Sequence, residues 1–388
     1  MNIAIVGTGP AALMAGSQCV LRGHSVTFYE QKKAAGRKFL VAGHGGFNLS
    51  HAEEQAAFLS RYSGPEIRAC VAQFDNDALV QWLQLIGIET YVGSTGKIFP
   101  AKGIKPIQVL KTWLDWLSGK GAVFHYAHRM TGFTADTLSI EHAGQLQEIP
   151  FDHLFLALGG GSWAKTGSDA AWVSLFREHG IAVRDLQASN AGMNCQLPAD
   201  AAAFAGTVLK NVVASHGSQH KTGEITLTEY GIEGAPVYHL NASYRKHPEL
   251  PLLIDLKPQW TLEKLVADFR KAGQSGTALK NAKLSKAVIW LLKNTLTKAQ
   301  YTDPEQLAHF VKHFPMAIDS LRNIDEAIST SGGVSWAAVN TDLSLKQFPK
   351  ISVCGEMLDW DAPTGGYLLQ GCFATGFVAG NGLEVSMK

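Results

Sequence analysis

The chain has 388 residues, of which 46% are hydrophobic and 17% are charged. This composition is typical of a globular protein and excludes a disordered one, and the length predicts two or three domains. The 34 Lys and Arg residues against 33 Asp and Glu leave a formal net charge of +1. This near-balance argues against nucleic acid or an anionic membrane as a partner, although a local basic groove stays open.

The cysteine and hydrophobic patterns indicate the cellular environment. Five cysteines are widely spaced and form no Cys-x-x-Cys pair, which is typical of small buried side chains in a reducing compartment. No apolar run approaches the roughly 20 residues that a membrane-spanning helix needs. The first strand begins at residue 2 or 3, which leaves no room for a signal peptide. We therefore expect a cytoplasmic protein with buried thiols and without a metal site.

The first thirty residues predict a nucleotide-binding strand–helix–strand unit. A short apolar run leads through a glycine-containing turn into a small-residue helix at 11–21. Gly7 suits the tight turn, Gly9 lets backbone N–H groups approach a pyrophosphate, and Ala12 lets the helix lie close to the strand. The second strand ends at Glu30, 21 residues beyond Gly9, where an acid accepts hydrogen bonds from ribose hydroxyls. An ordinary strand–helix turn would leave this acid unexplained.

The segment after the second strand is a glycine-rich loop that carries positive charge. Arg37 and Lys38 in this loop could face a pyrophosphate, and a solvated basic turn is the alternative. Residues 53–90 are predicted to be mostly helical, residues 91–100 to be extended or a hairpin, and residues 107–117 to form an amphipathic helix.

Strands dominate the next part of the chain. Residues 123–126 predict a parallel strand and the residues after them a meander. The buried strand at 154–158 runs into Gly159–Gly161, and three glycines let the chain pass close to a large planar or phosphate-bearing ligand. A plain strand and turn is the alternative.

The composition changes near residue 187. Alternating stretches over 191–244 predict a small antiparallel barrel or sandwich, and helices follow Pro258. We therefore expect an inserted module at 189–334, with a helical part nested inside its β part. The last fifty residues return to a strand, a glycine turn and a small-residue helix at 367–379, which could complete the first domain.

Several segments carry a family likeness over nearly the whole chain: VGTGPAALMAG, GRKFLVAGHGGFNLSH, LALGGGSWAKTGSDAAW, LTEYGIEGAP, STSGGVSW and CGEMLDWDAPTGGYLLQGCFATGFVAG. Their sequence and order resemble the BaiN-like NAD(P)/FAD-dependent oxidoreductases. The resemblance implies an α/β fold, namely a glutathione-reductase-type FAD-binding Rossmann-like domain with an inserted β-barrel and helical subdomain. The domains would comprise 1–188 with 335–388 for FAD, 189–258 with 315–334 for the barrel, and 259–314 for the helices.

The resemblance also implies where FAD would be contacted. Two departures from the family limit the transfer: many relatives have Arg-Cys where this chain has Gly46-Phe47, and others have Asn at the position of Leu368. No role for that cysteine is transferred. The implied contacts are Gly7, Gly9, Pro10, Ala11, Ala12, Glu30, Gln31, Arg37, Lys38, Asn48, Met130, Ala157, Gly159, Gly355, Glu356, Gly366, Tyr367 and Leu368.

Three features suggest roles in flavin chemistry. The helix that begins near Gly366 would direct its N–H groups at the flavin N1/O2 edge, where reduction places negative charge; a packing helix is the alternative. Tyr230 could donate a proton to a substrate carbonyl or enolate, and His44 in the glycine-rich loop could face the flavin. Structural packing and a solvated loop histidine are the respective alternatives.

We therefore expect an FAD-dependent oxidoreductase, specifically a reductase that transfers hydride through flavin N5 to an unsaturated or oxo small molecule. A second glycine fingerprint is absent, so NAD(P)H would bind transiently, or another donor is used. One alternative is a flavin-dependent RNA-modifying enzyme, which would need a basic groove on the inserted module. Another is a non-catalytic FAD-binding protein. The sequence indicates no oligomeric state.

Overall fold

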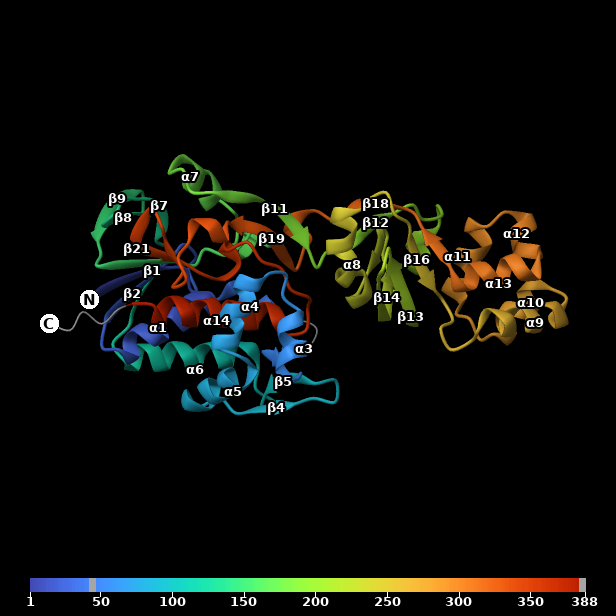
Figure 1. The fold of residues 1–388 in the computed structure, drawn as a ribbon, viewed down its shortest axis with the longest axis horizontal. Coiled ribbons are helices and arrows are strands. Elements are labelled where there is room, and N and C mark those ends of the chain that lie inside the picture. The colour runs from blue at the N-terminus through green and yellow to red at the C-terminus, as the bar shows by residue number, and fades with distance from the viewer. Residues whose placement is uncertain (42–46, 384–388) are drawn as a thin grey trace. The chain divides into compact units, whose positions relative to one another are not determined.

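The computed structural model describes residues 1–41 and 47–383, and the chain divides into two compact units (Figure 1). Unit 1 comprises Met1–Gln187 and Ser329–Lys388, so both ends of the chain belong to it, and unit 2 comprises Ala188–Ile328. The crossings between the units lie in or beside β11 (Val183–Ser189) and β19 (Ser329–Val334), which pair in a two-stranded sheet.

A six-stranded sheet forms the centre of unit 1, in the order β20-β21-β10-β1-β2-β6. Its strands run parallel except for the antiparallel pair of β20 and β21. The first apolar run of the sequence is β1, which is buried because helices and loops cover both faces of a parallel sheet. The strands are β1 (Asn2–Val6), β2 (Ser25–Glu30), β6 (Val123–Tyr126), β10 (His153–Leu156), β20 (Ser344–Leu345) and β21 (Phe348–Val353).

Three helices lie on one side of this sheet: α1 (Pro10–Leu21), α6 (Pro106–Gly119) and α14 (Tyr367–Asn381) (Figure 1). α14 packs closely on α1 because it presents glycines to it. A Cβ at Gly376 would lie 2.3 Å from the Ala11 carbonyl oxygen, and a Cβ at Gly380 would lie 2.6 Å from the Ala15 carbonyl oxygen. The small residues that mark both helices in the sequence therefore make this close contact.

The described part of unit 1 also contains two antiparallel three-stranded sheets and five further α-helices. One sheet has the order β3-β5-β4 and includes the predicted hairpin at 91–100; the other, β7-β8-β9, is the predicted meander. The strands are β3 (Ser50–His51), β4 (Thr90–Val92), β5 (Lys97–Pro100), β7 (Arg129–Phe133), β8 (Thr137–His142) and β9 (Gln145–Pro150). The helices are α2 (Arg37–Val41), α3 (Gln55–Ser60), α4 (Pro65–Gln73), α5 (Asn76–Leu85) and α7 (Trp172–Glu178).

Unit 2 contains a seven-stranded antiparallel sheet in the order β17-β16-β13-β14-β15-β12-β18. Its two edge strands, β17 and β18, are separated in the chain by Ala317 alone. Since successive Cα atoms are about 3.8 Å apart, the two edges approach each other and the sheet curls like a barrel. The strands are β12 (Met193–Cys195), β13 (Val208–His216), β14 (Gln219–Leu227), β15 (Gly231–Glu233), β16 (Leu252–Asp255), β17 (Phe314–Met316) and β18 (Ile318–Leu321).

Helices follow β16 in unit 2, as the sequence predicted. They are α9 (Leu262–Ala272), α10 (Ser275–Asn281), α11 (Lys286–Thr295), α12 (Lys298–Thr302) and α13 (Pro304–Lys312). The prediction of short alternating strands over 191–244 was wrong at the end of this segment, where α8 (Ala235–Lys246) forms. α8 has Pro236 in its first turn, and Val237, Leu240 and Asn241 are buried at helical spacing.

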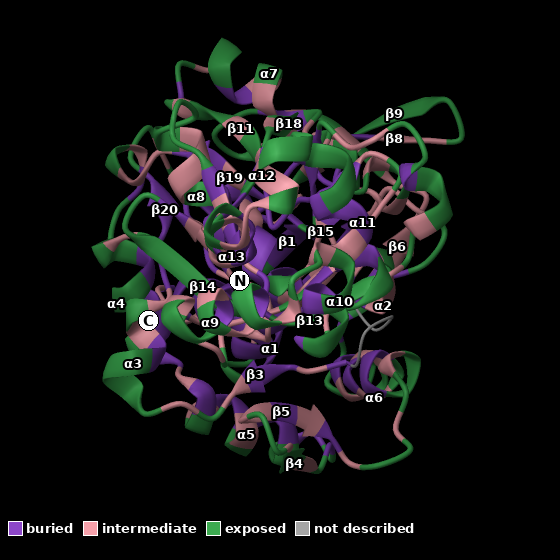
Figure 2. Ribbon diagram, turned by 90° about the vertical axis from the view of Figure 1, so that its right-hand side faces the viewer, coloured by how far each residue is buried: buried purple, intermediate pink, exposed green. Residues whose placement is uncertain are grey.

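Each unit has its own hydrophobic core, and buried residues line the inner sides of the helices (Figure 2). All five cysteines are buried and free, as predicted. Among the helices of the described ranges, none is long and apolar enough to cross a bilayer.

Candidate functional site

Unit 1 contains a cavity of about 460 Å³ at the carboxyl ends of four parallel strands. Gly7 follows β1, Glu30 ends β2, Ala157 follows β10 and Cys354 follows β21, and all four residues line the cavity. In open α/β sheets this edge is where ligands bind, because the loops and helix N-termini that follow the strands meet there.

Most of the contacts that the sequence resemblance implied meet in this cavity. The structure brings together residues from both ends of the chain, as an extended ligand would require. The predicted residues that line it are Gly7, Gly9, Pro10, Ala11, Glu30, Gln31, Arg37, Lys38, Met130, Ala157, Gly159, Gly355 and Glu356.

The other predicted residues do not line the cavity. Ala12 is fully buried inside α1, and the segment Gly366–Leu368 begins α14 outside the cavity wall. The Nδ2 atom of Asn48 is buried and has no hydrogen-bond partner within residues 1–41 and 47–383. His44 lies outside the described residues, so its predicted role stays a prediction.

The Glu30 carboxylate is held in place at the end of β2. Its Oε2 accepts a hydrogen bond from Thr8 Oγ1 at 2.5 Å, and its Oε1 accepts one from the Lys32 backbone N–H at 2.9 Å. Burial raises the pKa of Glu30, whereas these two hydrogen bonds lower it. Because a carboxylate has about four lone-pair sites, Glu30 retains acceptor capacity towards the cavity.

The N-terminus of α1 is open at the cavity wall. Gly9 is its N-cap residue, no side chain caps it, and Pro10 occupies its first turn. The first N–H groups of an α-helix have no partner inside the helix and attract anions. A Cβ at Gly9 would meet no atom within 4 Å, so open space lies where such an anion would be bound.

The two basic residues of the glycine-rich loop have different environments. Lys38 Nζ lies 2.7 Å from Glu356 Oε2 and donates to Ser162 Oγ at 2.7 Å. The charge of Lys38 is therefore already balanced. Arg37 is exposed and, in the described part of the chain, has no carboxylate within ion-pair distance. Arg37 is thus the residue of this pair that can bind a phosphate.

The loop after β10 contributes cavity residues that the sequence analysis did not single out. Ser168 is buried and lines the cavity, and its Oγ has no hydrogen-bond partner among the described residues. A Cβ at Gly159 would lie 2.8 Å from that oxygen, and Trp172 Nε1 donates to the Gly159 carbonyl at 3.0 Å. Gln31 Nε2 donates to the Gly167 carbonyl at 2.7 Å. The segment SWAKTGSDAAW was noted in the sequence for its family resemblance, but nothing in it indicated that Ser168 lines a ligand cavity.

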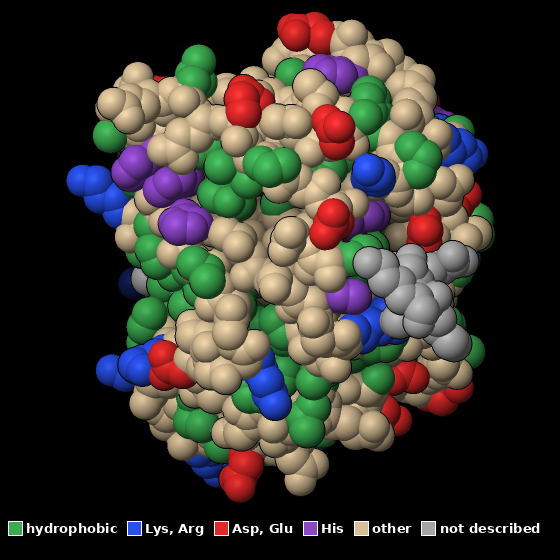
Figure 3. All heavy atoms as spheres, turned by 90° about the vertical axis from the view of Figure 1, so that its left-hand side faces the viewer, with side chains coloured by type: hydrophobic (Ala, Val, Ile, Leu, Met, Phe, Trp, Pro, Cys, Tyr) green, Lys and Arg blue, Asp and Glu red, His purple; other side chains and the backbone are tan. Residues whose placement is uncertain are grey.

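A group of histidines lies beside the Glu30 end of the cavity. His128 lines the cavity, and its ring stacks on His142 with centroids 4.0 Å apart; His125 lies 5.1 Å from His128. Burial and the two neighbouring histidines lower the pKa of His125. Several histidine side chains are grouped on this face of unit 1 (Figure 3). The cavity wall beside Glu30 therefore includes the imidazole ring of His128, which is backed by the rings of His125 and His142.

The cavity contains no reactive thiol. Cys354 and Cys372 line it, but burial raises the pKa of Cys354 to about 12 and holds the pKa of Cys372 well above its usual range. Both thiols stay protonated at neutral pH, and the thiolate is the nucleophilic form. Among the described residues, no cluster of His, Cys, Asp and Glu side chains is arranged to hold a metal ion.

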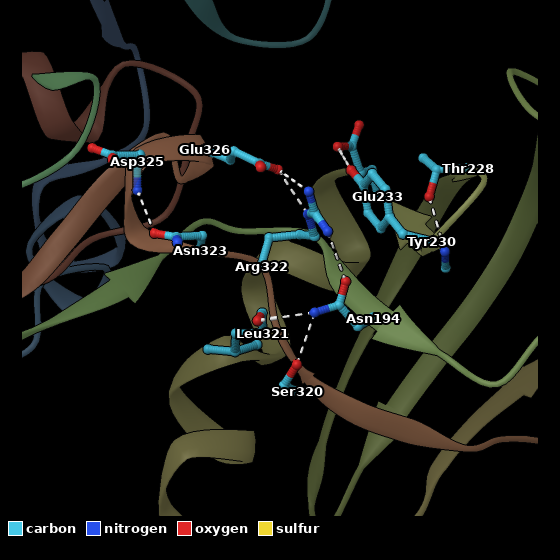
Figure 4. Close-up of polar contacts among 11 residues, drawn as sticks. Asn194, Thr228, Tyr230, Glu233, Ser320, Leu321, Arg322, Asn323, Asp325 and Glu326 are labelled. Atoms are coloured by element: carbon cyan, nitrogen blue, oxygen red, sulfur yellow. Dashed lines mark hydrogen bonds and ion pairs between the residues drawn. The ribbon is translucent and has the colours of Figure 1, made fainter. Parts of the chain in front are cut away.

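Tyr230 belongs to a polar cluster in unit 2 (Figure 4). Its hydroxyl donates a short hydrogen bond to Glu233 Oε1, and the Arg322 guanidinium lies 4.0 Å from the centroid of its ring. Burial and the hydrogen bond to Glu233 raise the pKa of Tyr230. Arg322 also pairs with Glu326 and donates to Asn194 Oδ1 at 3.0 Å. The phenol is therefore oriented and remains protonated over the physiological pH range.

Comparisons with known proteins agree with this fold. The family described as "HI0933-like protein Rossmann domain" matches residues 1–382. A 3-dehydro-bile acid delta(4,6)-reductase from Clostridium scindens is 26% identical over 421 residues, covering 98% of each chain. A ribosomal RNA dihydrouridine synthase from Haemophilus influenzae is 21% identical over 387 residues, covering 96% of each chain.

A solved structure shares the fold at lower identity. It is a 3-ketosteroid-delta4-(5alpha)-dehydrogenase from Rhodococcus jostii RHA1, which is 14% identical, covers 97% of this chain and 95% of its own, and has a TM-score of 0.53. The resemblance and fold class predicted from the sequence are confirmed. The chain belongs to the HI0933-like Rossmann family and is an oxidoreductase with the flavoprotein fold.

Proposed function

We propose that the chain binds FAD in the cavity of unit 1 and reduces a carbon–carbon double bond that is conjugated to a carbonyl group. The names of the Clostridium and Haemophilus relatives both describe the addition of hydrogen to such a bond. The observation that carries the proposal is the meeting of Gly9, Glu30 and Ser168 in one cavity at the ends of parallel strands.

The residues of the cavity fit an extended dinucleotide. Glu30 would accept hydrogen bonds from ribose hydroxyls, and the N–H groups at the start of α1 would bind the pyrophosphate beside Gly9. Arg37 would add a second charge to the phosphates. The Ser168 hydroxyl, unpaired in the protein, would donate to an oxygen of the same ligand.

When bound, FAD would supply hydride-transfer chemistry at this site. The start of α14 lies outside the wall of this cavity and has no side-chain cap at Gly366, so its N–H groups would stabilise negative charge only on a part of the ligand that extends beyond the cavity. We further propose Tyr230 as the group that protonates the substrate carbon or enolate oxygen after hydride addition. Its hydrogen bond to Glu233 orients the phenol, and its raised pKa keeps it protonated at neutral pH; because a higher pKa also makes it a weaker acid, it would transfer its proton only to a strongly basic enolate.

The test is anaerobic reduction of the purified holoprotein. NADH and NADPH are added separately, and loss of the oxidised flavin absorption is followed. A conjugated enone is then added, with its saturated ketone as the matched control. We expect reoxidation by the enone alone. Absence of flavin in the purified protein and failure to bind added FAD would overturn the cofactor assignment; reduction without reoxidation by any conjugated substrate would leave a non-catalytic FAD-binding protein.

A second substrate class has the same chemistry. The 5,6 double bond of uracil is conjugated to a carbonyl, so a uridine in RNA would accept hydride in the same way as an enone. The name of the Haemophilus relative favours this candidate. A uridine-containing RNA therefore belongs in the reoxidation screen beside the small-molecule enones.

A further inference from the structure

Positive charge is concentrated in one part of unit 2. Residues 269–302 contain seven Lys and Arg residues and no Asp or Glu. The whole chain carries +1, so the other 354 residues together carry −6, which is 1 minus 7. The segment covers the end of α9 and all of α10, α11 and α12.

The lysines of this segment point to solvent and have no carboxylate partner. Six of them are exposed, and in the described residues none takes part in an ion pair: Lys271, Lys280, Lys283, Lys286, Lys293 and Lys298. The basic residues at the borders differ, because Lys264 pairs with Asp268 and Arg270 pairs with Glu305. The six lysines, called the basic surface below, therefore form a charged patch that the protein does not neutralise.

The helices expose polar groups between these lysines. Ser285 caps α11, and Lys286 and Lys293 lie seven residues apart on that helix, which places them on one face two turns apart. The apolar side chains of α11 point inward, where Val288, Leu291 and Leu292 are buried. Figure 2 shows the helices of unit 2 from the side, and exposed residues, drawn in green, lie on α9 and α10.

We propose that the basic surface binds the phosphate backbone of RNA. Unpaired lysines beside serine, threonine and asparagine hydroxyls and amides are the groups that contact phosphates. A lipid surface would also attract the charge, but membrane-binding helices bury an apolar face as well. None of the exposed large hydrophobic side chains of the described chain lies within 262–312. RNA binding by the basic surface does not depend on the proposed reductase activity. Only the further step, reduction of a uridine in the bound RNA, rests on the proposed function.

Fluorescence anisotropy of a labelled single-stranded oligouridylate, titrated with the full-length holoprotein at several salt concentrations, tests this proposal. The test variant is Lys283→Gln/Lys286→Gln. The matched control is Lys102→Gln/Lys350→Gln, which removes two exposed lysines from unit 1. Each lost phosphate contact lowers the magnitude of the salt slope by about 0.7 for single strands, so we expect the slope to fall by about 1.4 and the affinity at 0.1 M salt to fall about 25-fold. The control should bind like the wild type.

Three outcomes would overturn the proposal. The first is no binding of RNA by the wild type, and the second is an equal loss in the test and control variants. The third is binding to phosphatidylserine vesicles, but not to RNA, that the test variant removes. Lys293→Gln repeats the test should the double variant misfold, as judged by circular dichroism and flavin content. Flavin reduction by NADH is measured in parallel, so a failed reductase and a failed RNA site give different results.

Discussion

Replacing Gly9 with alanine is expected to abolish tight FAD binding while the fold is retained. The backbone of Gly9 has φ −76°, which alanine adopts without strain, and the new Cβ would meet no protein atom within 4 Å. Alanine is a poorer N-cap residue than glycine by about 0.5–1 kcal/mol. The reduced entropy of the unfolded chain offsets this by about 0.4–1 kcal/mol. The free energy of unfolding should therefore change by less than about 1 kcal/mol.

The same Cβ would occupy the space in front of the α1 N-terminus. A pyrophosphate bound there accepts charge-assisted hydrogen bonds from backbone N–H groups, each worth about 1.5–3 kcal/mol. Loss of one such bond corresponds to at least a tenfold rise in the Kd of FAD, since 1.4 kcal/mol is about a factor of ten. Titration of the apoprotein with FAD, followed by quenching of flavin fluorescence, measures this change.

Gly7→Ala is the contrasting variant because it damages the fold itself, in addition to altering a residue that lines the cavity. Gly7 has φ +104°, and a Cβ there would lie 2.4 Å from the Ala157 carbonyl oxygen. The backbone strain costs about 1–3 kcal/mol, and the clash adds about 1–3 kcal/mol. Urea unfolding of the two apoproteins should therefore separate them clearly. If Gly9→Ala binds FAD with wild-type affinity while remaining folded, the pyrophosphate does not lie at the start of α1.

Three further changes test other parts of the account. Glu30→Gln should raise the Kd of FAD several-fold but leave FMN binding unchanged, because FMN lacks the adenosine ribose; equal losses for both ligands would contradict the ribose assignment. Ser168→Ala should stabilise the apoprotein by about 1–3 kcal/mol, since it removes an unpaired buried hydroxyl, while weakening FAD binding; unchanged FAD affinity would exclude Ser168 from the site. Burial lowers the pKa of His153 to about 4 in the folded protein. As the pH falls from 6.5 to 4, the imidazole is protonated in the unfolded chain before it is protonated in the folded one. The free energy of unfolding therefore falls by about 3 kcal/mol over this range. His153→Gln should flatten the pH dependence of unfolding in that window, and an unchanged slope would place the acid sensitivity elsewhere.

The nucleotide-binding half of the fold was predictable because its signals are local. β1, the turn at Gly7–Gly9, α1 and β2 follow one another within the first thirty residues, and each has its own pattern. The same holds for β21 and α14 at the other end of the chain. β1, β2 and β21 join one sheet because each is a short apolar run that needs to be covered on both faces.

The electrostatic details were not predictable from local patterns. Lys38 and Glu356 are 318 residues apart, and no feature of either segment indicates that the carboxylate neutralises the ammonium group. From the sequence, Lys38 was therefore assigned the same phosphate-binding role as Arg37, although of these two residues only Arg37 lacks a carboxylate partner in the described part of the chain. Ser168 was missed for the same reason, since its closeness to Gly159 depends on how the loop after β10 folds back.

The net charge of the chain does not describe each part of its surface. At physiological salt the Debye length is about 8 Å, so a phosphate at the surface responds to nearby side chains and not to the sum over the chain. The acidic residues that bring the total to +1 all lie outside residues 269–302. An FAD-binding unit needs few positive charges, because backbone N–H groups and one arginine can hold the pyrophosphate. The unpaired lysines of α10 and α11 are therefore not needed to hold the cofactor, and under the RNA proposal a polyanion is the partner whose charge matches theirs.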